Sequence, residues 1–210
     1  KLAALAGLGL LAGGGMVSSI YRFRVSRQQL PVAGLQAPVR IAQLSDLHYG
    51  AFLQEGSVSS WVRATMAARP DLILLTGDYI DSRTGMDPEP FFRAISALQA
   101  PLGVWAAWGN HDHVSRRRLA LLADAFDRAG FGVLVNGSVI VREDLQVAAI
   151  DDWKLGSPDI EGTLGGLTPD VPSVFITHNP DALPELPAGS VSVAIAGHTV
   201  GSHTYGHIDL

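Results

Sequence analysis

Residues 71–81 read DLILLTGDYID, an apolar run that ends in Gly77-Asp78. Leu72 to Thr76 has the length and composition of a buried β-strand, and the glycine and aspartate mark its end. The same arrangement, an apolar run followed directly by a polar motif, occurs at four other places. These motifs are Asp46-Leu47-His48, Gly109-Asn110-His111-Asp112, His178 and Gly197-His198. The sequence therefore predicts five buried strands, each with Asp, Asn or His at its C-terminal end.

Polar side chains at the ends of five strands would meet at one edge of a sheet, where α/β proteins usually have their functional sites. Asp46 and His48 are two residues apart on an extended segment, so that both side chains can point the same way. The chain has no cysteine, which excludes thiolate ligands. Carboxylate, amide and imidazole groups suit Mn, Fe, Zn, Ni or Co. We therefore expect a metal site at this edge.

The first half of the chain alternates between strand and helix patterns. After a strand at Val39 to Ser45, a helix with one apolar face is predicted, with Ser57 as its N-cap. Another helix is expected to begin near Asp87, and a third to run from an N-cap at Ser115 to Gly130. This alternation is typical of an α/β fold.

The second half is richer in strands. Val133 to Val135 and Ser138 to Val141 flank Asn136-Gly137, which suits the type I′ turn of a β-hairpin. Glu143-Asp144 predicts another turn, before a strand at Leu145 to Ile150. We therefore expect a second sheet packed on the first.

Composition sets limits on the function. A length of 210 residues favours one main domain, and the net charge of −5 argues against a nucleic-acid partner, which would require a basic face. Leu2 to Ile20 carries no charge and is followed by Arg22, Arg24 and Arg27. This pattern predicts a membrane anchor or signal segment over residues 1–20. A buried helix or a removed signal peptide is the alternative.

The expected organisation is an N-terminal segment 1–20, a linker 21–37 and a domain over residues 38–210. The visible basic residues after the apolar segment favour a domain on the cytoplasmic face of a membrane. Since the chain does not begin with Met, charges before Lys1 are unseen and the side of the membrane stays open.

The complete series of motifs is similar to that of the calcineurin-like metallophosphoesterase superfamily. The segments SDLHYG at 45–50 and LTGDYID at 75–81 resemble those of the bacterial membrane-associated phosphodiesterase branch, which includes UDP-2,3-diacylglucosamine hydrolases. The resemblance implies a four-layer α/β/β/α sandwich of two mixed sheets flanked by helices. It also implies a binuclear centre of two divalent metal ions (Mn, Zn, Fe or Ni).

The resemblance further implies a role for each motif. It assigns Asp46, His48 and Asp78 to one ion, and Asp78, Asn110, His178 and His198 to the other. His111 would lie near the leaving group, with Asp112 orienting it. Arg116 and Arg117 would either contact a substrate phosphate or form the solvated first turn of a helix.

One motif departs from the family pattern. The last motif is usually Gly-His-x-His, whereas Val200 occupies the place of the second histidine here. His203 or His207 is a possible substitute ligand. The chain ends at Leu210, earlier than the final strands of the family would suggest, and we expect the C-terminus of the domain to be truncated relative to the family.

The expected function is that of a metal-dependent phosphoesterase. It would hydrolyse a phosphodiester or pyrophosphate bond through a water activated by two metal ions. The substrate would be a phosphorylated small molecule, a nucleotide or a lipid-linked molecule. The alternatives are a phosphomonoesterase and, because of Val200, a catalytically impaired binding module tethered to a membrane. The oligomeric state stays open.

Overall fold

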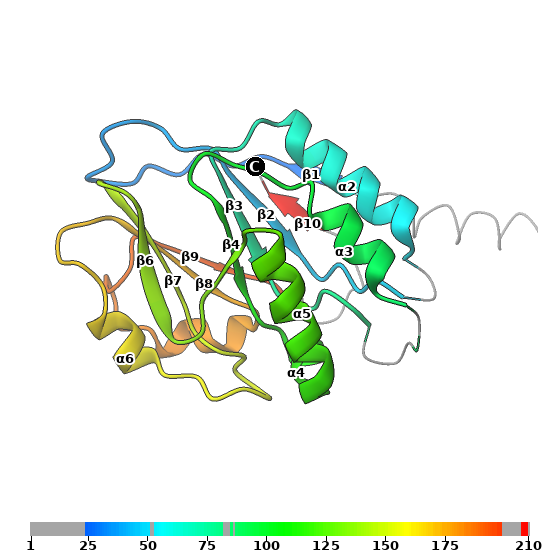
Figure 1. Ribbon diagram of the computed structural model, residues 1–210. Helices are drawn as coiled ribbons and strands as arrows, with labels where there is room; N and C mark the ends of the chain where they lie inside the picture. The colour runs from blue at the N-terminus through cyan, green and yellow to red at the C-terminus, as the bar shows by residue number, and fades with distance from the viewer. Residues whose placement is uncertain (1–23, 51–52, 82–84, 86, 199–206, 210) are drawn as a thin grey trace, which may run out of the picture.

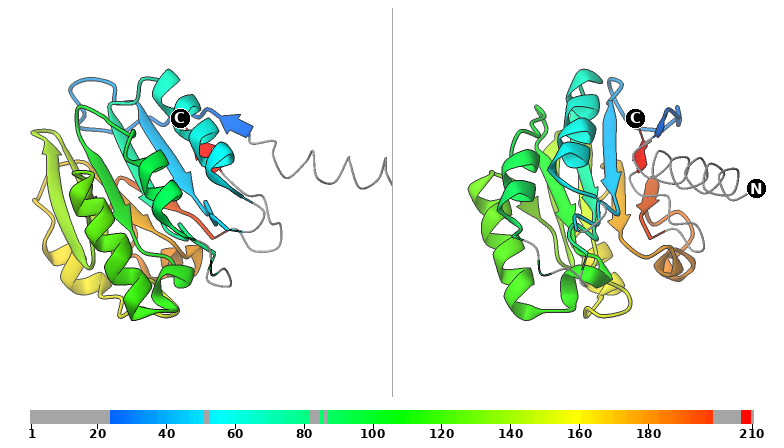
Figure 2. Two further views of the ribbon diagram at one scale, coloured as in Figure 1. Left: turned by 45° about the vertical axis from the view of Figure 1, so that its right-hand side comes forward. Right: turned by 90° about the vertical axis from the view of Figure 1, so that its right-hand side faces the viewer.

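The computed structural model describes residues 24–50, 53–81, 85, 87–198 and 207–209. Two β-sheets pack face to face, and helices cover the outer face of each sheet (Figures 1 and 2). This is the predicted α/β/β/α arrangement. The fold class is therefore confirmed.

The first sheet has the strand order β1-β10-β2-β3-β4-β5. Its strands are β1 (Arg24–Ser26), β2 (Ile41–Ser45), β3 (Leu72–Thr76), β4 (Val104–Ala107), β5 (Gly132–Val133) and β10 (His207–Asp209). From β2 to β5 the strands are parallel, whereas β10 runs antiparallel to β2. The sheet is therefore mixed, as expected. β1 lies within the segment that the sequence assigned to a linker.

The helices after β2, β3 and β4 are α2 (Glu55–Ala67), α3 (Glu89–Ile95), α4 (Asn110–His113) and α5 (Arg116–Arg128). Ser115 caps α5, since its hydroxyl accepts a hydrogen bond from the N–H of Arg118, as predicted. The predicted cap at Ser57 is wrong. α2 begins three residues earlier than predicted, with Gln54 at its N-cap, and Ser57 N–H donates to Gln54 O within the first turn.

The second sheet consists of β6 (Gly137–Arg142), β7 (Leu145–Ala149), β8 (Ser173–Thr177) and β9 (Val193–Ala196), in that order. β6 and β7 are antiparallel and are joined by the predicted turn at Glu143-Asp144. The predicted hairpin around Asn136-Gly137 is wrong, because β5 pairs with β4 in the first sheet and β6 belongs to the second.

Asn136 has a φ of +53° and turns the chain from one sheet to the other. Its Oδ1 accepts hydrogen bonds from the N–H groups of Asp151 and Asp159. A sequence that suits a tight turn therefore serves here as a crossing between layers.

Three apolar clusters fill the three spaces between the four layers. The first lies between the first sheet and α2, α3 and α5, and the second lies between the two sheets. The third lies between the second sheet and its outer helices, α6 (Ile160–Gly165) and the 3₁₀ helix η1 (Pro180–Glu185). Because both faces of β3 and β8 are covered, their side chains are buried throughout, which explains the uninterrupted apolar runs.

In the part of the chain that the structure describes, no helix is long and apolar enough to cross a membrane. The predicted anchor or signal segment 1–20 lies outside the described residues. The same holds for Val200 and His203, and for the side chain of His207.

Candidate metal centre

The polar motifs of both sheets meet at one edge of the sandwich. His178, which follows β8, places its Nε2 atom 3.1 Å from Asn110 Oδ1, 3.1 Å from His198 Nδ1 and 3.3 Å from Asp78 Oδ2. Asp78 and Asn110 come from the first sheet, whereas both histidines come from the second. The donor atoms that the sequence predicted to converge are therefore adjacent.

The motif after β2 completes this cluster. His48 Nε2 lies 3.7 Å from Asp46 Oδ1 and 3.6 Å from Asp78 Oδ2. Asp46 Oδ2 accepts a hydrogen bond of 3.0 Å from the N–H of His198, which ties the two sheets together. The structure thus brings together all six residues predicted as ligands. We call Asp46, His48, Asp78, Asn110, His178 and His198 the donor cluster.

Two groups of side chains at this edge could hold a metal ion. Their donor atoms lie within 4.8 Å of one another in each group. One group is Asp46, Asp78, His178 and His198, and the other is His48, Asp78 and His111. Asp78 belongs to both, which suits a carboxylate shared by two ions. The groups divide the residues differently from the resemblance, so the ligands of each individual ion stay a prediction.

The backbone of this edge is strained. Four residues of the donor cluster have a positive φ, namely Asp46 (+54°), His48 (+39°), Asp78 (+58°) and His198 (+47°). This conformation costs a non-glycine residue about 1 to 2 kcal/mol. Strain of this kind gathers at functional sites, where the surrounding structure holds it in place.

Gly109 allows Asp78 to pass close to the loop after β4. A Cβ atom on Gly109 would lie 2.6 Å from the backbone nitrogen of Asp78 and would also collide with its Oδ1. The carboxylate of Asp78 instead accepts a hydrogen bond of 2.8 Å from the N–H of His111. The glycine of this motif is therefore required by space and not by φ.

The buried acids and imidazoles of the site influence one another's pKa values. Burial raises the pKa of Asp46, but the hydrogen bond with His48 and the charge of His178 have a larger, opposite effect. Together they lower the pKa of Asp46 to about 2. Burial lowers the pKa of His178, but the hydrogen bond and the charge of Asp78 have a larger, opposite effect and raise this pKa to about 9. The carboxylates that follow the first sheet and the imidazole of His178 on the second sheet therefore favour each other's charged forms.

The side chain of His178 has a fixed orientation. Its Nδ1 atom lies 2.8 Å from the carbonyl oxygen of Thr76, to which it can donate, and this leaves Nε2 directed at the donor cluster. A carbonyl behind an imidazole is a usual way to set the tautomer and direction of a metal-binding histidine. His178 is fully buried, which makes this arrangement rigid.

Gln43 bridges the two sheets directly below the donor cluster. Its Nε2 donates to Thr76 Oγ1 (2.9 Å) within the first sheet and to Ala196 O (3.0 Å) at the end of β9. The distance between the strand ends of the two sheets is therefore held by buried hydrogen bonds as well as by packing.

Asp112 is fully buried and contacts backbone groups. Its carboxylate accepts hydrogen bonds from the N–H groups of Asp78 (2.9 Å), Tyr79 (3.1 Å) and Gly109 (2.8 Å). Burial and the nearby charge of Asp78 raise its pKa to about 7. These contacts fix the loops after β3 and β4 relative to each other, which is the geometry of a positioning residue.

His111 and the neighbouring arginines lie on the side of His48. The rings of His111 and His48 meet edge to face with centroids 4.8 Å apart, and His111 Nδ1 is 4.0 Å from Asp81 Oδ1. Arg116 and Arg117 are exposed in the first turn of α5, so that a contact with substrate stays a prediction. Arg118, the third arginine of the run, donates to the carbonyl of Asp81.

The sequence did not indicate Lys154 as part of the site. Its Nζ lies 3.4 Å from His198 Nε2, although it is far from the other motifs in the sequence. No local pattern marks this lysine, because only the packing of the loop after β7 against the end of β9 brings it near. His113 and Asp151 form a similar link, at 2.7 Å, between α4 and the same loop.

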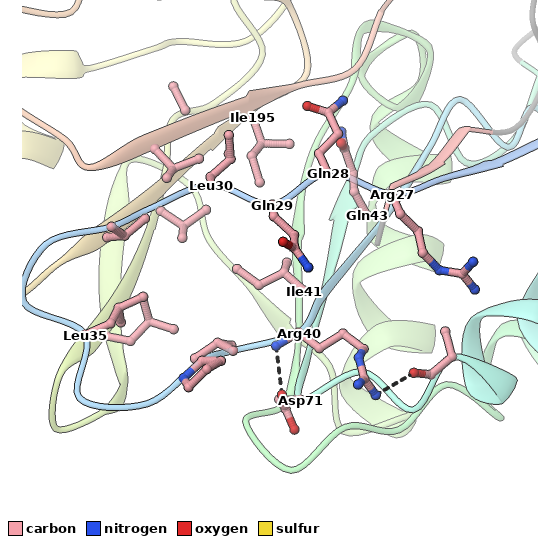
Figure 3. A pocket seen from close by; sticks show the side chains of 18 of the residues that line it. Arg27, Gln28, Gln29, Leu30, Leu35, Arg40, Ile41, Gln43, Asp71 and Ile195 are labelled. Carbon is pink, nitrogen blue, oxygen red and sulfur yellow. Dashed lines mark hydrogen bonds between the residues drawn. The ribbon is translucent and has the colours of Figure 1, made fainter.

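A groove of about 1330 Å³ lies between the two sheets along β2 and β9, and Gln43 is part of its lining (Figure 3). It is lined by the segment before β2, by β2 itself and by β9, with Leu30, Leu35, Ile41 and Ile195 among its apolar side chains. At one end the N–H of Arg40 donates a hydrogen bond of 2.8 Å to the carboxylate Oδ2 of Asp71. None of the donor cluster residues belongs to its described lining, so we do not place the chemistry there.

A sandwich of this kind, with carboxylate, amide and imidazole groups at the strand ends, defines a class of metal-dependent hydrolase domains. Residues 39–202 match the family model of the calcineurin-like phosphoesterases. The chain therefore belongs to the calcineurin-like phosphoesterase family. The predicted family is confirmed.

Curated relatives agree with this family. The chain is 32% identical over 167 residues to the uncharacterized metallophosphoesterase YkuE of Bacillus subtilis, covering 77% of this chain and 58% of YkuE. It is 28% identical over 173 residues to the phosphodiesterase YaeI of Escherichia coli, covering 79% and 62%. It is 22% identical over 209 residues to the UDP-2,3-diacylglucosamine pyrophosphatase LpxG of Chlamydia trachomatis, covering 78% and 64%. The chain thus spans about three fifths of the length of these relatives.

Among solved structures, the fold is similar to that of TT1561 of Thermus thermophilus. The TM-score is 0.50 at 14% sequence identity, over 82% of this chain and 89% of that one. At this identity the similarity supports the fold alone.

Proposed function

We propose that this protein is a metal-dependent phosphoesterase that hydrolyses a phosphodiester or pyrophosphate bond. The observation that carries the proposal is the donor cluster, in which the strand ends of two sheets bring two carboxylates, one amide and three imidazoles together. The 3.3 Å contact between the buried side chains of Asp78 and His178 at its centre distinguishes it from an exposed acidic patch. Membership of the phosphoesterase family gives the reaction class.

The side chains fit a pair of divalent ions. Asp46, His48 and Asp78 would hold one ion, and Asp78, Asn110, His178 and His198 the other. His203 or His207 would supply the ligand that Val200 lacks. Two such ions polarise a phosphoryl group and lower the pKa of a bound water. The donor set of oxygen and imidazole nitrogen suits Mn, Zn, Fe or Ni.

The remaining residues position these groups or act on the leaving group. Asp112 holds the backbone that carries Asp78 and Asn110, and the N–H of His111 holds the Asp78 carboxylate. The imidazole of His111 is partly exposed at the rim, where it can donate a proton to, or hydrogen-bond, the departing oxygen. Arg116 and Arg117, which are exposed in the first turn of α5, would attract an anionic substrate by charge.

The names of two relatives support a proposal for the substrate class. YaeI is named a phosphodiesterase and LpxG a pyrophosphatase of a diacylated nucleotide sugar. We propose a phosphorylated small molecule, a nucleotide or a lipid-linked molecule as substrate. The apolar residues 2–20 support association with a membrane through the N-terminal segment.

The test is hydrolysis of bis(4-nitrophenyl) phosphate in the presence of Mn²⁺ or Zn²⁺, compared with 4-nitrophenyl phosphate. We expect the diester to be the better substrate. Asp78→Ala should lower the rate by more than about 100-fold, because loss even of a residue behind a ligand commonly costs 10- to 100-fold.

Asp124→Ala is the matched control, because Asp124 is an exposed carboxylate on α5 that pairs with Arg128. It should leave the rate unchanged. Preferential hydrolysis of the monoester would indicate a phosphomonoesterase. The absence of any metal-dependent hydrolysis and of metal binding would favour the binding module.

A further inference from the structure

Lys154 is held beside the donor cluster by a buried carboxylate. Asp152 is fully buried, and its Oδ2 accepts hydrogen bonds from the N–H groups of Lys154 (3.0 Å) and Leu155 (2.7 Å). The N–H of Gly156 donates to the carbonyl of Asp152 and closes the turn. The backbone of Lys154 is therefore fixed, while its side chain reaches toward His198, with Nζ 3.4 Å from Nε2.

The ammonium group of Lys154 has a weak protein partner. Its Nζ lies 3.8 Å from Asp181 Oδ2, and the two side chains are 47% and 57% exposed. Exposed ion pairs at this distance contribute little, because water screens them and both side chains lose rotamer freedom. An anionic ligand at the donor cluster can therefore take the place of Asp181 at small cost.

The position of Nζ determines which part of a substrate it can reach. A phosphoryl group that reacts at the donor cluster would lie at the ions that Asp78, Asn110 and His178 would hold. Lys154 lies on the outer side of His198, because His198 Nδ1 faces His178 and its Nε2 faces Lys154. A flexible four-carbon stem lets the ammonium follow a ligand there. In a pyrophosphate the neighbouring phosphate is an anion at that location. In a simple diester the same place holds an uncharged substituent.

We propose that Lys154 binds the phosphate next to the one that reacts, and that it selects pyrophosphate-linked substrates over simple diesters. This inference rests on the proposed function, since it assigns the reacting phosphoryl group to the donor cluster. Lys154 acts in it as a specificity-determining residue. Asp181 acts as a competitor for its ammonium group.

Binding tests the proposal without turnover. The probes are methylenediphosphonate, which carries two adjacent anionic groups and is not hydrolysed, and inorganic phosphate, which carries one. Both are titrated calorimetrically into full-length protein at a fixed Mn²⁺ concentration. Lys154→Met, which keeps the length and removes the charge, should weaken diphosphonate binding by about 10- to 30-fold. Phosphate binding should weaken by a much smaller factor.

Two further variants keep the test selective. Lys154→Arg retains the charge and should recover most of the affinity for diphosphonate. Asp181→Asn removes the competing carboxylate and should tighten diphosphonate binding by a small factor of about two to three. The melting temperature of each variant should stay close to that of the unchanged protein, because the fixed backbone of the turn does not depend on the Lys154 side chain.

The proposal is overturned if the unchanged protein does not bind diphosphonate more tightly than phosphate, or if Lys154→Met weakens both probes equally. Hydrolysis of bis(4-nitrophenyl) phosphate, measured in parallel, separates this failure from that of the proposed function. Selective diphosphonate binding without hydrolysis would reject the hydrolase and would keep Lys154 only as a residue that binds the second phosphate group. Hydrolysis together with an equal effect of Lys154→Met on both probes would keep the hydrolase and reject the role of Lys154.

Discussion

At the scale of single residues, the close approach of Gly109 to Asp78 offers a sharp test. Gly109→Ala adds one methyl group where a Cβ would lie 2.6 Å from Asp78 N, so that the Asp78 loop must shift. We expect a loss of about 1 to 3 kcal/mol in the free energy of unfolding, as for other overpacked sites. Calorimetric titration should also show at least about tenfold weaker Mn²⁺ binding, because Asp78 belongs to both metal-binding groups.

Gly56→Ala is the matched control for this change. Gly56 lies in α2, and a Cβ there would meet no atom within 4 Å. Alanine should stabilise the protein by about 0.5 to 1 kcal/mol, since glycine in a helix has more freedom to lose on folding. Equal effects of the two substitutions on Mn²⁺ binding would show that Gly109 is not a spacing residue.

At the scale of the elements, α5 is attached to the first sheet by aromatic contacts. Phe126 is fully buried and its ring meets those of Tyr79, Trp108 and Phe131 at centroid distances of 4.9, 5.7 and 5.6 Å. Phe126→Ala should cost about 3 to 5 kcal/mol, measured by urea unfolding, because it leaves a cavity in the core. Leu121→Ala, on the 44% exposed outer face of the same helix, should change stability by less than about 0.5 kcal/mol.

The turn between β6 and β7 carries a pH-dependent contact. Asp144 accepts hydrogen bonds from the side chain of Arg142 and from the N–H of Gln36, and Arg142 donates to Ala37 O. The hydrogen bond from Arg142, followed by that from Gln36, lowers the pKa of Asp144 below its usual value. The stabilisation is therefore present above the ordinary aspartate pKa of about 4, and is lost as the pH falls through the lowered folded value.

Asp144→Asn should accordingly lower the urea midpoint at neutral pH. The difference from the unchanged protein should stay constant at pH values above the ordinary aspartate pKa of about 4. It should close as the pH falls through the lowered pKa of Asp144 in the folded protein. A difference that persists at the lowest pH would mean that the contact is not ionic.

At the scale of the whole molecule, the proposed ions should stabilise the fold. A ligand that binds only the folded state at 100 times its dissociation constant adds about 2.7 kcal/mol. For a domain of this size we expect Mn²⁺ to raise the melting temperature by roughly 5 to 10 °C and EDTA to reverse this. Asp78→Asn should show no rise. A rise of the same size in that variant would place the ions elsewhere.

How much the sequence predicts also depends on scale. The strand ends with Asp, Asn and His were predictable, because buried parallel strands are continuous apolar runs and their ends are marked by polar residues. The crossing at Asn136 was not predictable, since the same dipeptide suits a hairpin and only the pairing of β5 with β4 decides the outcome. The N-cap at Gln54 and the contact of Lys154 with His198 likewise depend on tertiary packing, which leaves no local signal.

The cross-link made by Gln43 has one more consequence. The carboxylates and the amide come from the first part of the chain, while His178 and His198 come from the last. Gln43 links the two sheets at the place where these two sets of side chains meet. Any catalytic activity therefore requires both sheets, because neither sheet alone carries the whole donor cluster. A protein cleaved between β5 and β6 would yield two inactive fragments. Any change that separates the two sheets would abolish activity before the chain unfolds.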